Sequence, residues 1–68
     1  MIEVRYRLLD PHNRKMETIY KTKYEAKKSL THSKNMHPLE SEVDKRFKEF
    51  ERMGWKLEQV VIQEQNIH

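Results

Sequence analysis

The chain has 68 residues, no cysteine, a formal net charge of +3 and 37% charged residues. This length leaves room for one hydrophobic core, so we expect residues 1–68 to form a single small domain. Disulfides are excluded, and the lack of cysteine is typical of a reducing compartment, so we expect a cytoplasmic protein. No apolar run approaches the ~18 residues of a membrane span, so we expect no membrane partner.

Two alternating segments open the chain and predict a hairpin. Apolar residues at every second position from Ile2 to Leu8 are typical of a strand with one buried face. Residues 10–13, Asp-Pro-His-Asn, favour a tight reversal. The alternation resumes over residues 14–20, so we expect a second strand that pairs with the first.

A helix is predicted after this hairpin. Thr22 and Glu25 match a capping box, in which both side chains satisfy free backbone N–H groups at a helix start. The helix should run from about Lys23 to Ser33. It must end before Pro38, because the residue ahead of a proline is pushed out of the helical region.

A second helix is predicted from about Glu42 to Met53, with Ser41 as its N-cap. Its acidic first turn complements the helix dipole, and Gly54 is suited to the cap at its end. Large apolar residues recur along it at helical spacing, which predicts one buried face. These residues are Val43, Phe47, Phe50 and Met53, or Gly54 as the turn closes.

Trp55 to Gln63 is predicted to form the last strand. It carries apolar residues on both faces, which favours a central position in the sheet or a bulge. An open strand edge can also pair with a copy of itself, so the sequence predicts a homodimer as one outcome. Residues 64–68 have no pattern and are expected to form a frayed tail.

Together these elements predict an α+β domain with the order strand-strand-helix-helix-strand. We expect an antiparallel three-stranded sheet covered by helices, with the second helix over one face.

The residue patterns that support catalysis or cofactor binding are missing from the sequence. The four histidines, His12, His32, His37 and His68, lack the cysteines that complete a structural zinc site, so we expect no metal. One glycine cannot build a phosphate-cradling loop or a dinucleotide fingerprint, so we expect no cofactor. Ser29 and Thr31 lie near His32, but neighbouring helical residues diverge by about 100°, which excludes a triad. We therefore predict that the protein is not an enzyme.

Charge is distributed unevenly along the chain. Residues 1–34 carry nine Lys and Arg against four acidic residues, whereas residues 35–68 carry five against seven. Helical spacing brings lysines of the first helix together, and two arginines on the polar face of the first strand extend the predicted patch. The candidate binding residues are Arg5, Arg7, Lys23, Tyr24, Lys27 and Lys28.

Three interpretations of this patch stay open. It can be a solvated surface, or it can steer an acidic protein partner toward the chain. It can also neutralise phosphates of a nucleic acid, with Tyr24 available for stacking on a base. Lysines outnumber arginines in the patch and acids are interspersed, which favours the first two interpretations.

Two segments resemble known families. Residues 20–30, Tyr-Lys-Thr-Lys-Tyr-Glu-Ala-Lys-Lys-Ser-Leu, resemble the opening of the helix in arm-type DNA-binding domains of phage and transposon integrases. In that family three strands precede the helix and read DNA in the major groove, whereas two strands are predicted here. Residues 47–61, which include Met-Gly-Trp-Lys-Leu, resemble the helix, Gly-Trp-Glu-Leu turn and strand of small bacterial and phage domains without an assigned activity.

These observations predict a small non-enzymatic regulatory protein that acts by binding another protein, as compact modulators from phages and mobile elements do. The alternative is a nucleic-acid-binding accessory protein that uses the basic N-terminal half.

Overall fold

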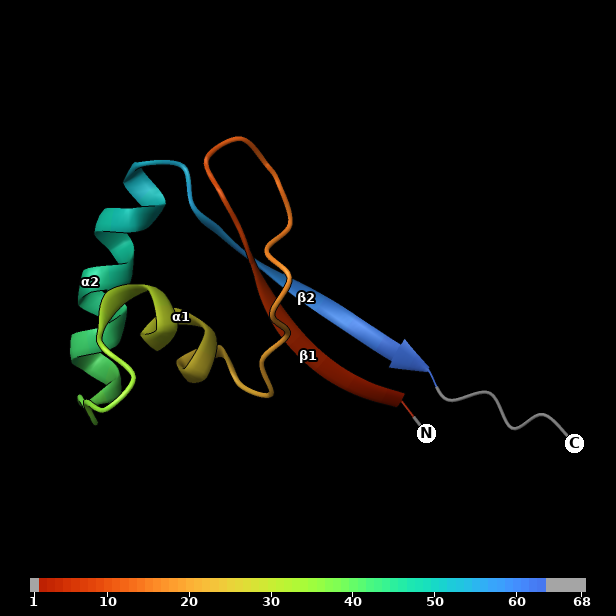
Figure 1. The fold of residues 1–68 in the computed structure, drawn as a ribbon, viewed down its shortest axis with the longest axis horizontal. Coiled ribbons are helices and arrows are strands. Elements are labelled where there is room, and N and C mark those ends of the chain that lie inside the picture. Colours follow the sequence, from red (N-terminus) through yellow and green to blue (C-terminus); the bar gives the residue numbers. More distant parts are fainter. Residues whose placement is uncertain (1, 64–68) are drawn as a thin grey trace, which may run out of the picture.

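The structure, a computed structural model, describes residues 2–63 of the chain. Its elements are β1 (Ile2–Leu9), α1 (Lys23–Thr31), α2 (Glu40–Arg52) and β2 (Lys56–Gln63). The two strands form an antiparallel sheet, and both helices lie at one end of it (Figure 1). The predicted frayed tail, residues 64–68, lies outside the described residues.

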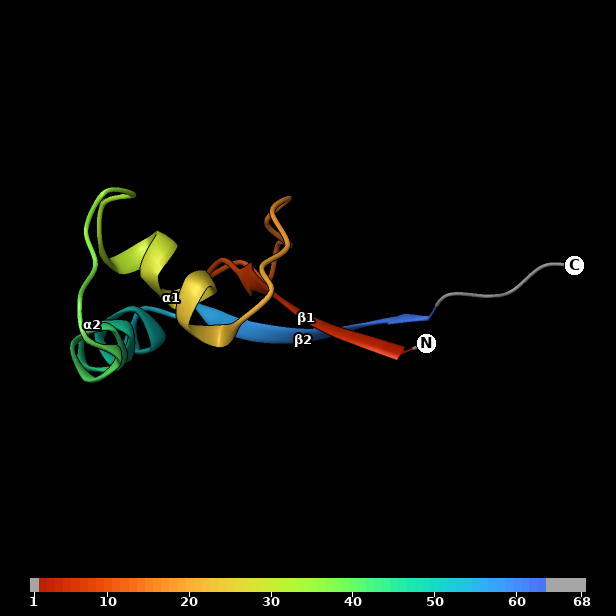
Figure 2. The same ribbon diagram turned by 90° about the horizontal axis from the view of Figure 1, so that it is seen from below.

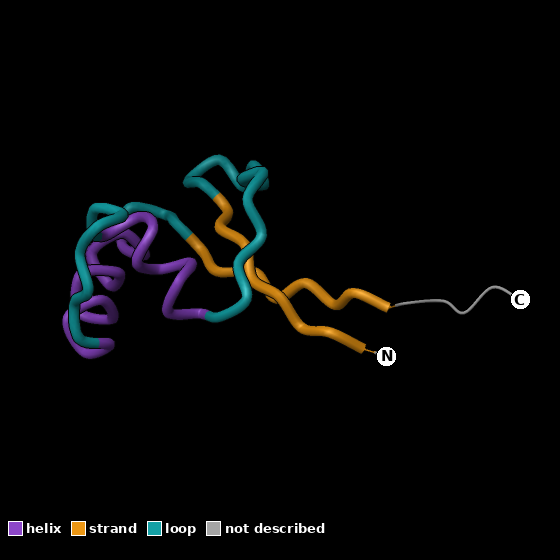
Figure 3. Tube along the Cα trace, turned by 60° about the horizontal axis from the view of Figure 1, so that its bottom comes forward, coloured by secondary structure: helices purple, strands orange, loops and turns teal. Residues whose placement is uncertain are grey.

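The predicted three-stranded sheet is wrong, because residues 14–20 do not form a strand. They run beside β1 (Figure 3) and form isolated bridges with it, between Lys15 and Leu9 and between Tyr20 and Tyr6. These bridges are five residues apart in the loop but three apart in β1. The two extra residues break the register, so a continuous ladder cannot form. The order is therefore strand-helix-helix-strand.

The position of β2 also differs from the prediction. It pairs with β1 along its whole length, from Lys56 opposite Leu9 to Gln63 opposite Ile2. Within residues 2–63 it has no second neighbouring strand, so it is an edge strand rather than a central one. Instead, β1 lies between β2 and residues 14–20, which we call the loop.

The predicted reversal after β1 is confirmed. The Asp10 carboxylate accepts hydrogen bonds from the backbone N–H groups of His12 and Arg14 at 2.8 and 2.9 Å. The Arg14 guanidinium donates to the other carboxylate oxygen at 2.7 Å. The bond from the Arg14 backbone is the main cause that holds the pKa of Asp10 below its ordinary value.

Both helices lie close to their predicted positions. The Thr22 hydroxyl accepts a 3.1 Å hydrogen bond from the Glu25 backbone N–H, which is one of the two bonds that the capping box predicts. However, α1 ends at Thr31, two residues before the predicted end. The N-cap of α2 is Leu39, which makes no side-chain bond, so Ser41 lies inside the helix and does not cap it.

Both helices lie toward one end of the molecule, with α1 between the strands and α2 (Figure 2). The prediction that α2 covers the sheet is wrong, because α1 contacts both strands and α2 packs on α1. The small core lies where α1 meets the sheet and α2. Its buried apolar residues are Leu8, Ala26, Val43 and Phe47. The predicted burial of Met53 is wrong, because this residue follows the last residue of α2 as its C-cap and is 59% exposed.

Candidate functional site

The ribbon tip is the part of the sheet that the helices leave uncovered. We define it as residues 2–5 of β1 and 60–63 of β2, paired from Ile2 opposite Gln63 to Arg5 opposite Val60. The nine residues of α1 span about 13 Å, whereas eight-residue strands extend about 26 Å. The tip therefore runs beyond both helices and the loop (Figures 1 and 2).

One face of the ribbon tip is apolar and exposed. Alternate residues of a strand share a face, so this face continues the one that carries Tyr6 and Leu8. The Lys23 ammonium, at the start of α1, lies 5.8 Å from the centre of the Tyr6 ring, and Leu8 is buried. Beyond them the same face has no cover within residues 2–63. Its exposed residues are Ile2, Val4 and Val61, at 66%, 37% and 54% exposure.

The outer edge of β2 presents backbone groups without a partner in residues 2–63. Tyr6 and Tyr20 exchange backbone hydrogen bonds of 2.8 and 2.6 Å, so the N–H and C=O of Tyr6 point away from β2. Gln59, directly opposite Tyr6, must then point its own N–H and C=O away from β1. The same holds for every second residue of β2. These residues are Leu57, Gln59, Val61 and Gln63.

The two predicted arginines lie on the other face of the sheet, so the structure does not bring them beside the helical lysines. Arg5 pairs with Glu3 at 3.0 Å, and Arg7 pairs with Glu58 across the strands at 2.8 Å. The hydrogen bond from Arg7 is the main cause that holds the pKa of the Glu58 carboxyl below its ordinary value. Both guanidinium groups are therefore engaged within the fold.

Two predicted residues of α1 connect this helix to α2 and to the segment that precedes α2. The Lys27 ammonium lies 3.0 Å from an Asp44 carboxylate oxygen and 5.4 Å from the centre of the Phe47 ring. The Tyr24 hydroxyl donates a 2.6 Å hydrogen bond to the Pro38 carbonyl. These contacts give both side chains a structural role.

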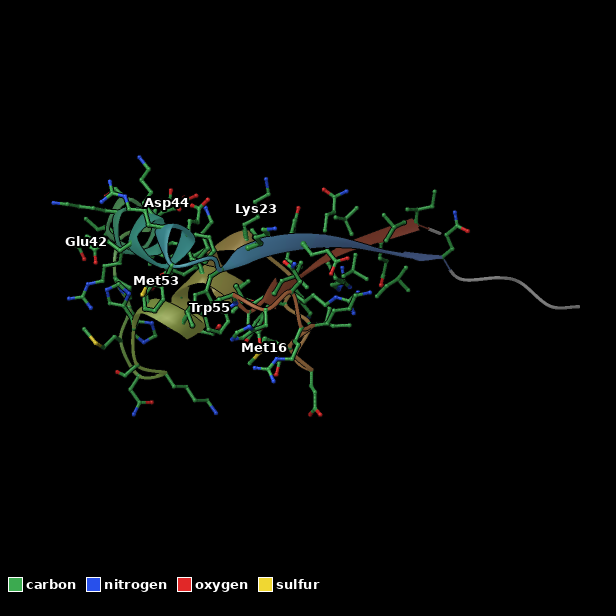
Figure 4. All side chains as sticks on the ribbon, turned by 90° about the horizontal axis from the view of Figure 1, so that it is seen from above. Met16, Lys23, Glu42, Asp44, Met53 and Trp55 are labelled. Atoms are coloured by element: carbon green, nitrogen blue, oxygen red, sulfur yellow. The ribbon has the colours of Figure 1, made fainter. Side chains whose placement is uncertain are left out.

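Lys23 and Lys28 are more accessible but point to different places. Lys23 is exposed and projects on the opposite side of the strands from the loop residue Met16 (Figure 4). Lys28 lines a shallow groove of about 620 Å³ between α1 and the loop. Residues of both charge signs line this groove, since Glu25 lies in it together with Lys28 and Lys34. The six predicted residues thus do not form one continuous surface.

Among the four histidines, His32 is hydrogen-bonded to a neighbouring side chain, and His68 lies outside the described residues. The Thr31 hydroxyl donates to the Lys27 carbonyl at 3.0 Å and lies 2.8 Å from Nδ1 of His32. A hydroxyl whose hydrogen is used in this way accepts from that nitrogen. Within residues 2–63, no three His, Asp or Glu side chains gather in a geometry that could hold a metal ion.

Neither helix in the described part of the chain has the length and apolar character needed to cross a membrane. Comparison of the chain with models of protein families, with curated proteins and with solved structures finds no match. The two short resemblances to known families therefore stay expectations.

The sequence patterns discussed above do not predict the exposed ribbon tip. They place Ile2, Val4 and Val61 on faces of strands, but they do not indicate that this part of the sheet is uncovered. A signal was present in the element lengths, because a predicted helix of about eleven residues spans roughly 16 Å and cannot cover a strand of more than 20 Å.

Proposed function

We propose that this chain is a small non-enzymatic binding protein that docks on another protein through the apolar face of the ribbon tip. A cytoplasmic setting belongs to this proposal and rests on the cysteine-free composition. The observation that carries the proposal is the exposure of Ile2, Val4 and Val61 on the face that α1 covers farther along the sheet.

Physical chemistry supports a partner on this face. A two-stranded ribbon is only marginally stable in water, and further strands or a packed element are needed to stabilise it. Full burial of an exposed Val or Ile contributes about 1.5–3 kcal/mol, so covering three half-exposed residues contributes a few kcal/mol. A docked apolar surface would supply this burial.

The charges near the ribbon tip define the chemistry of the partner. Lys23 is exposed and borders the apolar face at Tyr6. A protein with an apolar patch and acidic residues at its rim fits this arrangement, because opposite potentials steer association.

The nucleic-acid interpretation receives less support from the structure. Arg5, Arg7 and Lys27 are each paired with a carboxylate, and the Tyr24 hydroxyl is bonded to Pro38. A phosphate would have to displace these acids. Titration of labelled DNA and RNA at low and high salt separates the two roles, because phosphate binding weakens steeply as salt rises.

The test of docking is co-purification from cell lysate with the tagged chain, followed by titration of the recovered protein. Ile2→Asp and Val4→Asp place a charge on the apolar face, and we expect each to weaken binding at least tenfold. Leu39→Asp is the matched control, because Leu39 is 69% exposed and lies at the start of α2, away from the tip.

Recovery of no protein at a stoichiometric level would contradict the proposal. Equal binding by the Ile2→Asp and Leu39→Asp variants would also contradict it, since the ribbon tip would then play no part.

A further inference from the structure

We infer that the outer edge of β2 pairs with β2 of a second copy of this chain. The two strands run antiparallel about a two-fold axis at Val61 and form a four-stranded sheet in the order β1, β2, β2, β1. This inference goes beyond docking on another protein, because it uses the strand edge and not the apolar face.

The first observation is that this edge is unprotected. Natural sheets guard their edges with charges, prolines or bulges, since free N–H and C=O groups pair with other chains. Residues 59–63, Gln-Val-Val-Ile-Gln, contain neither a charge nor a proline. Their outward backbone groups, on Gln59, Val61 and Gln63, have no partner within residues 2–63.

The edge of β1 provides a contrast within the same sheet. The N–H and C=O of Tyr6 are hydrogen-bonded to Tyr20 in the loop, and the C=O of Leu8 accepts from the Met16 N–H. The loop thus covers part of that edge, whereas no backbone group within residues 2–63 bonds to the outer edge of β2. Any strand added to this sheet therefore finds its longest free edge on β2.

The second observation is that the segment is complementary to itself. With the axis at Val61, Val61 faces Val61 of the second copy, and Val60 faces Ile62. Gln59 then faces Gln63, so apolar residues meet apolar residues and amides meet amides. An axis at Gln59 would instead set Glu58 opposite Val60. Glu58 and Glu64 border the uncharged segment in the sequence.

The arrangement of the fold leaves space for this pairing. The helices lie at the Leu57 end of β2, whereas the ribbon tip extends away from them (Figures 1 and 2). In an antiparallel pair the helices of the second copy lie beyond the tip of the first. The product has four strands, which meets the requirement that a two-stranded ribbon does not.

Charge at the paired glutamines tests the register. Q59K/Q63K places two positive charges opposite each other at both ends of the segment, whereas Q59K/Q63E places opposite charges there. Neither variant changes Ile2, Val4 or Val61. Because positions 59 and 63 are about 13 Å apart within one strand, the difference between the variants must arise between copies.

The measurement is sedimentation equilibrium over a concentration series, with circular dichroism of dilute samples to verify folding. We expect the unmodified chain to dimerise at micromolar concentration, Q59K/Q63K to weaken the dimer at least tenfold, and Q59K/Q63E to dimerise more strongly than Q59K/Q63K. High salt should reduce the difference between the variants.

A chain that stays monomeric at millimolar concentration would overturn the inference. Equal association of the two charged variants would overturn the proposed register. Either failure is separate from docking, which is measured with Ile2→Asp and Val4→Asp on a different protein.

Discussion

Lys27 of α1 and Asp44 of α2 form an ion pair of 3.0 Å that joins the two helices. The Lys27 ammonium also lies over the Phe47 ring, which belongs to the core. Lys27, which the sequence pattern places in a binding patch, therefore links α1 to α2.

This pair predicts energetic coupling between the two helices. In a double-mutant cycle with Lys27→Met and Asp44→Asn, we expect a coupling free energy of about 0.5–1 kcal/mol, because the pair is only partly buried. Urea unfolding of the four proteins measures it, and 1 M salt should reduce it. Strictly additive effects would show that the pair makes no contribution.

Gly54 predicts a strict requirement for glycine at the turn between α2 and β2. Its φ is +107°, and a Cβ built there would lie 3.1 Å from Cβ of Pro11. We expect Gly54→Ala to lower the free energy of unfolding by at least about 1 kcal/mol.

The neighbouring residue supplies the control for this glycine. Met53 is 59% exposed and has an ordinary helical backbone, so Met53→Ala should change stability by less than about 0.5 kcal/mol. Thermal melts of both variants decide the question. A Gly54→Ala protein as stable as the Met53→Ala protein would show that the turn relaxes without cost.

Asp10 predicts a dependence of stability on pH. The pKa of its carboxyl is lowered in the folded chain, so the unfolded chain binds its proton more readily. Its stabilising contribution is present above the ordinary aspartate value of 3.8 and is lost as pH falls through the lower native pKa.

The Asp10→Asn variant isolates this contribution. We expect the difference in unfolding free energy between the unmodified chain and the variant to shrink between about pH 5 and pH 2. Urea titrations across this range measure it. A difference that does not change with pH would exclude Asp10 as the source.

We expect the Tyr24 hydroxyl to contribute to the stability of the fold. Tyr24→Phe removes the bond to the Pro38 carbonyl, and we expect a loss of about 0.5–1.5 kcal/mol in unfolding free energy. Tyr20→Phe is the control, because the Tyr20 hydroxyl has no hydrogen bond within residues 2–63. Equal stability of the two variants would contradict the prediction.

The local structure follows from residues that are close together in the chain. Alternation located β1, the Thr22 and Glu25 pair located the start of α1, and Asp10 located the reversal. In each case the signal is carried by residues within a few positions of one another, so neighbouring backbone and side-chain groups suffice to produce it.

The number of paired strands and the roles of the charged residues depend instead on contacts between distant parts of the chain. The loop over 14–20 alternates like a strand, but its register with β1 slips by two residues between its two bridges. The partners of Arg7 and Lys27, Glu58 and Asp44, are distant in sequence. Strand pairing and side-chain burial depend on which distant groups meet. The ribbon tip is uncovered for the same reason, because no distant segment within residues 2–63 packs on it.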